Sequence, residues 1–260
     1  MSDNEDIEYT AEFITKLQVA FGKGFLSPGG MEEVAKILEG IDLSGKEVLD
    51  IGVGIGGPAC LLVTHHGARK VTGIDVEEPV LGEARATVSS QNLQHQIELQ
   101  LVEPGPLPFD DATFDIVFSK DSIIHIPDKQ ALFGEVFRVL RPGGWLVMSD
   151  WYCSEAPFTE EMSSWVERTG LSFAMTPIAN DSSLLEKLGF LETAILDRNE
   201  WFADFSTKLV SQMGGPGYSY VVATLGQEGA DDWLSRAKAR AVVSAQGQLR
   251  PGHIRGRKPT

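Results

Sequence analysis

Apolar runs of strand length alternate with helical patterns between residues 46 and 150, and this alternation constrains the fold more than any other feature of the sequence. Strands that alternate with helices in this way are typical of βαβ units, in which a helix returns the chain so that successive strands run parallel. The sequence therefore predicts an α/β fold with a doubly wound, mostly parallel sheet. The expected strands are 48–51, 71–75, 97–102, 114–119 and one that begins at 145.

Helical patterns also flank this core. On the N-terminal side they cover 8–21 and 31–38, and on the C-terminal side they cover 159–173 and 202–245, with a break at 214–217. Two further strands are expected, at 193–196 and near the C-terminus. We expect the flanking helices to form a lid over the edge of the sheet where the parallel strands end.

A glycine-rich turn, Asp50-Ile-Gly52-Val-Gly54-Ile-Gly56-Gly57, directly follows the first expected strand. Its glycines permit a tight turn and let a ligand approach the backbone closely. Such a turn by itself is compatible with NAD, FAD or S-adenosylmethionine.

Acids at the ends of successive strands separate these possibilities. Asp50 precedes the glycines, where a carboxylate would repel a pyrophosphate but attract the ammonium group of an amino acid. Asp75 ends the second strand and is placed to accept hydrogen bonds from ribose hydroxyls, a role that would suit NAD equally. Glu103 follows the third strand and could accept a hydrogen bond from an adenine amino group. The order of the three acids favours S-adenosylmethionine over NAD.

This ordered set, which spans 46–150, resembles the class I S-adenosylmethionine-dependent methyltransferases. The resemblance implies a Rossmann-like fold, S-adenosylmethionine as cofactor and S-adenosylhomocysteine as product. An NAD-binding Rossmann domain is the alternative.

Two further motifs, one before this core and one within it, point to a narrower family. The segment from Tyr9 to Gly30 is similar to the N-terminal segment of phosphoethanolamine (phosphobase) N-methyltransferases, and Ser119-Lys-Asp-Ser-Ile-Ile-His125 is similar to their Ser-Arg-Asp-x-Ile-x-His motif. The resemblance implies Tyr9, Asp121 and His125 as catalytic residues. It also implies cofactor contacts from Leu26 and Ser27. Lys120, which stands at the position of a cofactor-binding arginine, keeps the positive charge but lacks the planar guanidinium fork. The complete set of expected cofactor-binding residues is Leu26, Ser27, Asp50, Gly52, Gly54, Asp75, Val76, Glu103, Pro104 and Lys120.

The chemistry of amine methylation agrees with this assignment. An amine attacks a methyl carbon only through its lone pair, so an ammonium substrate must first lose a proton. Histidine is the side chain best suited to accept that proton near neutral pH. Asp121 lies four residues before His125 and can orient the imidazole if the segment is helical. The alternative is that both side chains only stabilise a helix end and the loop before Pro127.

The positions that bind phosphate in this family have changed. Trp151 and Trp165 stand at tyrosine positions, Thr169 at an arginine, Leu171 at a second tyrosine and, in a looser alignment, Ala237 at a lysine. These losses argue against phosphoethanolamine as the substrate. The faces of Trp151 and Trp165 would suit a methylated ammonium group through cation–π attraction, although both could equally be packing residues.

The charge distribution bears on partners. The net charge is -15, but residues 233–260 hold seven Lys/Arg and no Asp/Glu, which leaves -22 on residues 1–232. An acidic body disfavours nucleic acid and anionic membranes as partners, and the basic tail is expected to pair with that body. The spacing of His, Cys, Asp and Glu predicts no metal site, and the acidic N-terminus and two cysteines are typical of a cytoplasmic protein.

We therefore expect a single methyltransferase domain over 1–260. Residues 1–45 would form N-terminal lid helices, 46–150 the cofactor-binding core, and 151–260 the substrate lid, helices and final strand. The expected activity is methylation of a small, non-phosphorylated amine or amino acid such as sarcosine or dimethylglycine. The alternatives are S- or O-methylation of a small metabolite and a non-catalytic S-adenosylmethionine-binding protein; the oligomeric state stays open.

Overall fold

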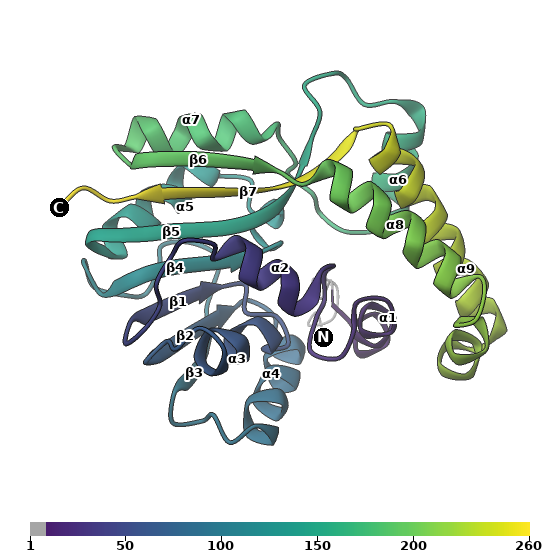
Figure 1. Cartoon of the computed structure of the whole chain (residues 1–260), viewed down its shortest axis with the longest axis horizontal. Coiled ribbons are helices and arrows are strands. Elements are labelled where there is room, and N and C mark those ends of the chain that lie inside the picture. The colour runs from purple at the N-terminus through teal and green to yellow at the C-terminus, as the bar shows by residue number, and fades with distance from the viewer. Residues whose placement is uncertain (1–8) are drawn as a thin grey trace, which may run out of the picture.

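A seven-stranded sheet forms the centre of the computed structural model, which describes residues 9–260 (Figure 1). The strand order is β3-β2-β1-β4-β5-β7-β6. Strands β1 to β5 run parallel, and β7 runs antiparallel to both of its neighbours. The predicted doubly wound, mostly parallel sheet is confirmed. The strands are β1 Glu47–Ile51, β2 Lys70–Asp75, β3 Ile97–Leu101, β4 Phe114–Lys120, β5 Leu140–Cys153, β6 Leu191–Asp197 and β7 Leu249–Arg257.

Helices cover both faces of the sheet because its central strands are apolar on both sides. Val48 packs into one core cluster with residues of three helices, and its neighbour Leu49 packs into a second cluster with residues of two others. Successive strand residues point to opposite faces, so this alternation is what a doubly covered sheet requires. The first face carries α2 Gly30–Ile37, α3 Gly57–Thr64 and α4 Glu78–Ser90, and the second carries α5 Lys129–Val139 and α7 Ile178–Leu188.

The remaining helices form a layer beyond the carboxyl ends of the parallel strands (Figure 1). This helical layer has its own apolar clusters, which join residues of all its helices. Its members are α1 Ala11–Phe21, α6 Glu160–Thr169, α8 Asn199–Met213 and α9 Tyr218–Ala245. Within residues 9–260, no helix is both long and apolar enough to cross a membrane.

Several helix boundaries differ from the sequence prediction, and two of the differences have a clear local cause. The first helix begins at Ala11, where the Thr10 side chain accepts a hydrogen bond from the Phe13 amide; residue 8, where we placed its start, lies outside the described part of the chain. Helix α6 ends at Thr169 rather than at 173. Gly170 stops it by adopting a left-handed conformation with φ of 68°, which glycine adopts without steric cost.

The basic C-terminal tail pairs with the acidic body, as expected. Its last strand, β7, lies between β5 and β6. Arg250 forms an ion pair with Asp197, and Arg257 forms one with Glu192. The Lys258 ammonium donates hydrogen bonds to backbone carbonyls at the C-terminal end of α5 and the start of β5. These contacts support a structural role for the tail.

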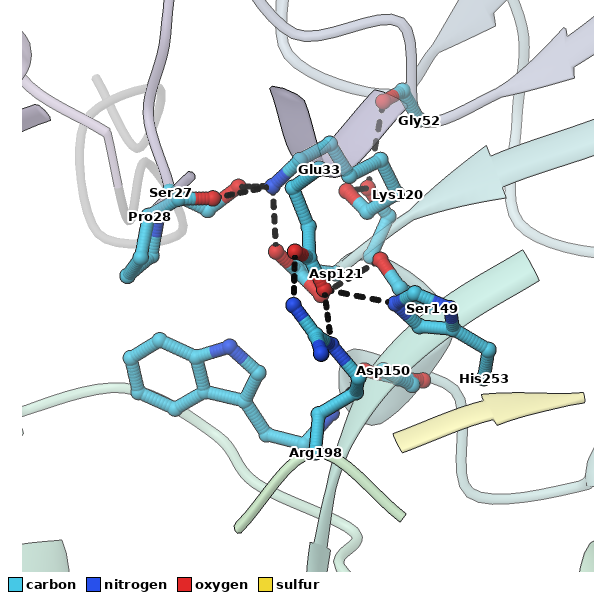
Figure 2. Close-up of polar contacts among 12 residues, drawn as sticks. Ser27, Pro28, Glu33, Gly52, Lys120, Asp121, Ser149, Asp150, Arg198 and His253 are labelled. Atoms are coloured by element: carbon cyan, nitrogen blue, oxygen red, sulfur yellow. Dashed lines mark hydrogen bonds and ion pairs between the residues drawn. The ribbon is translucent and has the colours of Figure 1, made fainter. Parts of the chain in front are cut away.

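A buried ionic cluster joins three distant parts of the chain beside the ends of the strands (Figure 2). The Glu33 carboxylate of α2 accepts two hydrogen bonds from the Arg198 guanidinium, at 2.9 and 2.7 Å, and lies 2.7 Å from His253 Nε2 of β7. Burial alone would raise the pKa of Glu33, but the hydrogen bonds from His253 and Arg198 outweigh burial and lower this pKa to about 2.

Replacing Glu33 with glutamine is expected to lower the free energy of unfolding by about 3–5 kcal/mol at neutral pH, because the variant leaves the partly buried Arg198 guanidinium without its buried counter-ion. Since folding lowers the pKa of Glu33, its contribution is present above the unfolded value near 4.5 and is lost as the pH falls through about 2. Urea unfolding at pH 7 and at pH 3 measures both effects. Glu39→Gln, a change in an exposed pair with Lys36, is the matched control and should change stability by at most about 0.5 kcal/mol.

Candidate active site

The glycine-rich turn lies at the end of β1, where the strand order reverses between β1 and β4 and ligands of α/β sheets usually bind. Gly52 has φ of 70°, and a Cβ atom there would lie 2.3 Å from the Ser122 side chain, so glycine is required. Asp75 anchors the turn, because its carboxylate accepts hydrogen bonds from the Gly54 amide at 3.0 Å and the Val76 amide at 2.9 Å. The turn is therefore fixed to the end of β2.

Asp50 carries an unsatisfied buried carboxylate oxygen beside this turn. Its side chain is 1% exposed, and its Oδ2 atom has no hydrogen-bond partner within the described residues. Burial, and to a smaller extent the charge of Asp75, raises the pKa of Asp50 to about 8. A buried acceptor without a donor costs stability, and the ammonium group of a bound amino-acid moiety would supply the missing donor.

An exposed apolar surface lies next to the turn. Val76 is 54% exposed after β2, and Leu101, which pairs with Asp75 in the sheet, is 50% exposed at the end of β3. Glu103 and Pro104 follow and are also exposed. An apolar surface with a carboxylate at its edge fits an adenine ring, whose faces are apolar and whose amino group donates hydrogen bonds. Leu101 was not predicted, although its position at a strand end was the available signal. These residues and Asp50 together fit S-adenosylmethionine.

A cavity separates the ends of the strands from the helical layer, and it brings together residues from the whole length of the chain. Tyr9, Leu26 and Ser27 line it from the N-terminal segment, and Asp121 and His125 line it after β4. Strand β5, the helical layer and the loops beside it contribute aromatic and basic side chains. These include Trp151, Trp165, Phe173, Trp233, Arg168 and Arg240.

His125 lines this cavity and contacts two other segments of the chain. Its Nδ1 atom lies 3.0 Å from the Ser172 carbonyl oxygen, and its Nε2 atom lies 3.2 Å from the Tyr9 hydroxyl. Because a carbonyl oxygen can only accept, the Ser172 contact assigns the proton of the neutral ring to Nδ1. In that tautomer the lone pair of Nε2 faces the Tyr9 hydroxyl, so Nε2 is the ring nitrogen that can accept a proton.

Asp121 does not orient His125 directly, contrary to the expectation from their spacing. Its carboxylate accepts hydrogen bonds from Lys120 Nζ at 2.7 Å and Ser149 Oγ at 2.8 Å (Figure 2). The segment is not an α-helix: Asp121 has φ of 56°, and the next turn, Ile123–His125, is a 3₁₀ helix. The Ser172 carbonyl takes the orienting position instead.

Lys120 fastens the N-terminal segment to the end of β4. Besides Asp121, its ammonium donates to Ser27 Oγ at 2.7 Å and to the Pro28 carbonyl at 2.9 Å (Figure 2). An ammonium group has three donors, and these acceptors use all of them. Lys120 therefore positions Leu26 and Ser27 at the cavity, and a direct contact between Lys120 and the cofactor stays a prediction.

The five altered phosphate-binding positions all line this cavity. Trp151 and Trp165 stack with ring centroids 6.0 Å apart, and Phe173 stacks on Trp165 at 5.9 Å. The cavity therefore has an aromatic wall, and both tryptophans also take part in packing. The other three altered positions, Thr169, Leu171 and Ala237, lie in the same lining.

Sequence reasoning missed Arg240, which is 7% exposed and also lines the cavity. The available signal was helical spacing. Trp233, Ala237 and Arg240 are four and three residues apart, so they share one face of α9. This spacing places Arg240 on the face that carries the altered lysine position.

Comparisons with known proteins agree with this geometry. A family model described as a methyltransferase domain matches residues 49–148. The chain is 28% identical over 255 residues to phosphoethanolamine N-methyltransferase of Triticum aestivum, covering 98% of this chain and 49% of the relative. It is 31% identical over 208 residues to methyltransferase GfsG of Streptomyces halstedii, covering 78% of this chain and 72% of the relative.

A solved structure has the same fold over almost the whole chain. Phosphoethanolamine N-methyltransferase 2 of Haemonchus contortus, in complex with phosphomonomethylethanolamine and S-adenosylhomocysteine, superposes with a TM-score of 0.89 at 25% identity, over 97% of this chain and 59% of that one. Its complex with S-adenosyl-L-methionine gives a TM-score of 0.90.

The chain spans about half the length of the curated plant phosphoethanolamine methyltransferases that it matches. The match to GfsG, by contrast, covers most of both chains. The fold, the turn with its acids and these similarities lead to one conclusion: the chain belongs to the family of S-adenosylmethionine-dependent methyltransferases.

Proposed function

We propose that this protein transfers the methyl group of S-adenosylmethionine to the nitrogen of a small amine. The observation that carries the proposal is the contact between Tyr9 and His125 at the wall of the cavity. The pair offers a hydroxyl and an imidazole ring nitrogen beside the end of β4. Such a pair can remove the proton that an ammonium substrate must lose before it becomes a nucleophile.

Residues of this chain can take up the proton that the substrate ammonium loses. When bound, the cofactor supplies an electrophilic methyl carbon on a sulfonium. The substrate ammonium gives up a proton through the Tyr9 hydroxyl to Nε2 of His125, and the freed lone pair forms the new carbon–nitrogen bond. Because the methyl group would come from the cofactor's sulfonium, S-adenosylhomocysteine would be the second product. Ser172 fixes the imidazole, and Asp121 and Lys120 hold the Ser27 segment in place.

We further propose that the substrate is a non-phosphorylated amine or amino acid such as sarcosine or dimethylglycine. The relatives are named for phosphoethanolamine, which supports the amine class. The aromatic wall of Trp151 and Trp165 and the altered Thr169 and Ala237 support a different acceptor. An indole face attracts a methylated ammonium group by roughly 0.5–2 kcal/mol, whereas each lost charged hydrogen bond to a phosphate forfeits roughly 1.5–3 kcal/mol.

A substrate panel tests this proposal. Ethanolamine, dimethylethanolamine, sarcosine, dimethylglycine and phosphoethanolamine would be compared by release of S-adenosylhomocysteine. We expect turnover of at least one non-phosphorylated amine at a higher kcat/KM than phosphoethanolamine. Preference for phosphoethanolamine would overturn the choice of acceptor. A thiol and an amine-free alcohol would be tested beside the panel, and turnover of either without turnover of an amine would favour S- or O-methylation. Binding of S-adenosylmethionine without any turnover would favour a sensor.

A further inference from the structure

Arg240 is a buried cation in the wall of the candidate active site. It lies near the C-terminal end of α9, and only 7% of its surface remains exposed. Its guanidinium carbon lies 5.2 Å from the ring centre of Phe21 and 5.9 Å from that of Phe202. Aromatic faces therefore surround the charge on the protein side, and the cavity lies on another side.

No protein group neutralises this charge within the described residues. The guanidinium of Arg240 forms no hydrogen bond or ion pair with any of them, and its Nε atom is fully buried without a partner. Burial lowers the pKa of Arg240 only to about 10, so the group stays protonated at neutral pH. Arginine is almost never buried without a partner, because an uncompensated charge is costly to take out of water.

The neighbouring arginines of the cavity differ in this respect. The Arg236 Nε atom donates to Asp232 at 2.8 Å, and Arg168 donates to Ser235 at 3.2 Å. Both are also more exposed than Arg240. Arg240 is therefore the buried arginine of the cavity lining, and its guanidinium donates no hydrogen bond to the described residues, unlike those of Arg168 and Arg236.

We propose that Arg240 binds the anionic group, a carboxylate or a phosphate, of the amine substrate. The inference rests on the proposed N-methylation and adds that the substrate is a zwitterion. Its amine would lie toward Tyr9 and His125, and its anion toward Arg240. Phe202 links the aromatic wall to Arg240: its ring packs against Trp151 with ring centroids 5.4 Å apart, and the Arg240 guanidinium carbon lies 5.9 Å from its centre. Both anions match the planar guanidinium fork.

Equilibrium binding to the complex with S-adenosylhomocysteine tests the inference without requiring turnover. The probes are sarcosine and phosphoethanolamine, which carry an anion, and dimethylamine and ethanolamine, which do not. Calorimetry or the fluorescence of Trp151, Trp165 and Trp233 would report binding. We expect at least one anionic probe to bind the wild type more tightly than its partner without an anion. The comparison of the two anionic probes then identifies the anion.

Arg240→Met is expected to weaken binding of that anionic probe by roughly 10- to 150-fold, the value of a charge-assisted hydrogen bond. Binding of dimethylamine and ethanolamine should not change. Arg240→Lys keeps the charge but loses the planar fork, so its affinity for the anionic probe should lie between those of the wild type and Arg240→Met. Lys238→Met is the matched control on the same helix, because Lys238 is exposed, and it should behave as the wild type.

The melting temperature separates this role from a structural one. Removing an unpaired buried charge should leave the melting temperature of Arg240→Met unchanged or raise it. A lower melting temperature with equal loss of affinity for all four probes would assign Arg240 to packing and overturn the inference. Equal affinities of the wild type for anionic and anion-free probes would also overturn it. Methylation of anion-free amines alone would leave the proposed function intact and remove only the role of Arg240.

Discussion

Replacing His125 with alanine is expected to lower kcat for an amine substrate by roughly 10²–10⁴-fold, the usual contribution of a general base. The binding of S-adenosylhomocysteine should persist, because the residues that fit the cofactor, Asp50 and Asp75 among them, lie at the ends of other strands. Steady-state kinetics and calorimetry measure the two quantities separately. The variant removes the ring nitrogen that faces the Tyr9 hydroxyl at 3.2 Å and leaves the aromatic wall in place.

The pH dependence of this loss in kcat tests more directly whether His125 acts as a base. An amine loses its own proton in solution as the pH approaches its pKa, so the need for a base in the protein declines. The deficit of His125→Ala should therefore shrink as the pH rises from 7 toward 9. Tyr9→Phe should show a smaller loss of kcat, which should also shrink as the pH rises. His95→Ala, in an exposed turn after α4, is the control. Full activity of His125→Ala at pH 7 would contradict the mechanism and favour a thioether nucleophile, which has no proton to lose.

The order of the strands and helices could be predicted because the periodicity of burial is local. Each central strand is a short apolar run between turn residues, and α5 shows its apolar face directly in the sequence. Helix ends were less predictable. The apolar pattern after Thr169 continues to Phe173, but Gly170 ends the helix, and the following segment instead brings the Ser172 carbonyl to His125.

The site residues whose positions follow from the backbone topology could be predicted from the sequence. Those whose positions or partners depend on tertiary contacts could not. Asp50 and Asp75 lie at the ends of adjacent parallel strands, so their proximity follows from the topology. The orienting partner of His125 comes from a loop 47 residues away, and no spacing rule reaches that far. Arg240 was missed for a related reason: its lack of a partner depends on every element that packs around it.

Binding of S-adenosylmethionine at pH 6 is expected to release about one proton per protein molecule. The free protein holds Asp50 protonated below its pKa of about 8, whereas the cofactor's amino group, with an ordinary pKa of about 8, is already protonated at pH 6. A salt bridge between the two needs the ionised carboxylate, so binding must expel the Asp50 proton. Calorimetry in two buffers with different ionisation enthalpies measures that proton, and proton-neutral binding by the wild type would contradict this role of Asp50.

Asp50→Asn should bind the cofactor without proton release and roughly 10- to 150-fold more weakly, since it loses a charge-assisted hydrogen bond. The same variant should make the free protein more stable in alkali. Folding raises the pKa of Asp50 from 3.8 to about 8, so stability is highest below the unfolded value and is lost as the pH rises through the folded one. Asparagine does not ionise, so Asp50→Asn does not lose stability in this way as the pH rises. A variant that is more stable than the wild type above pH 8 yet binds the cofactor poorly would show that this buried acid is retained for the ligand and at the expense of the fold.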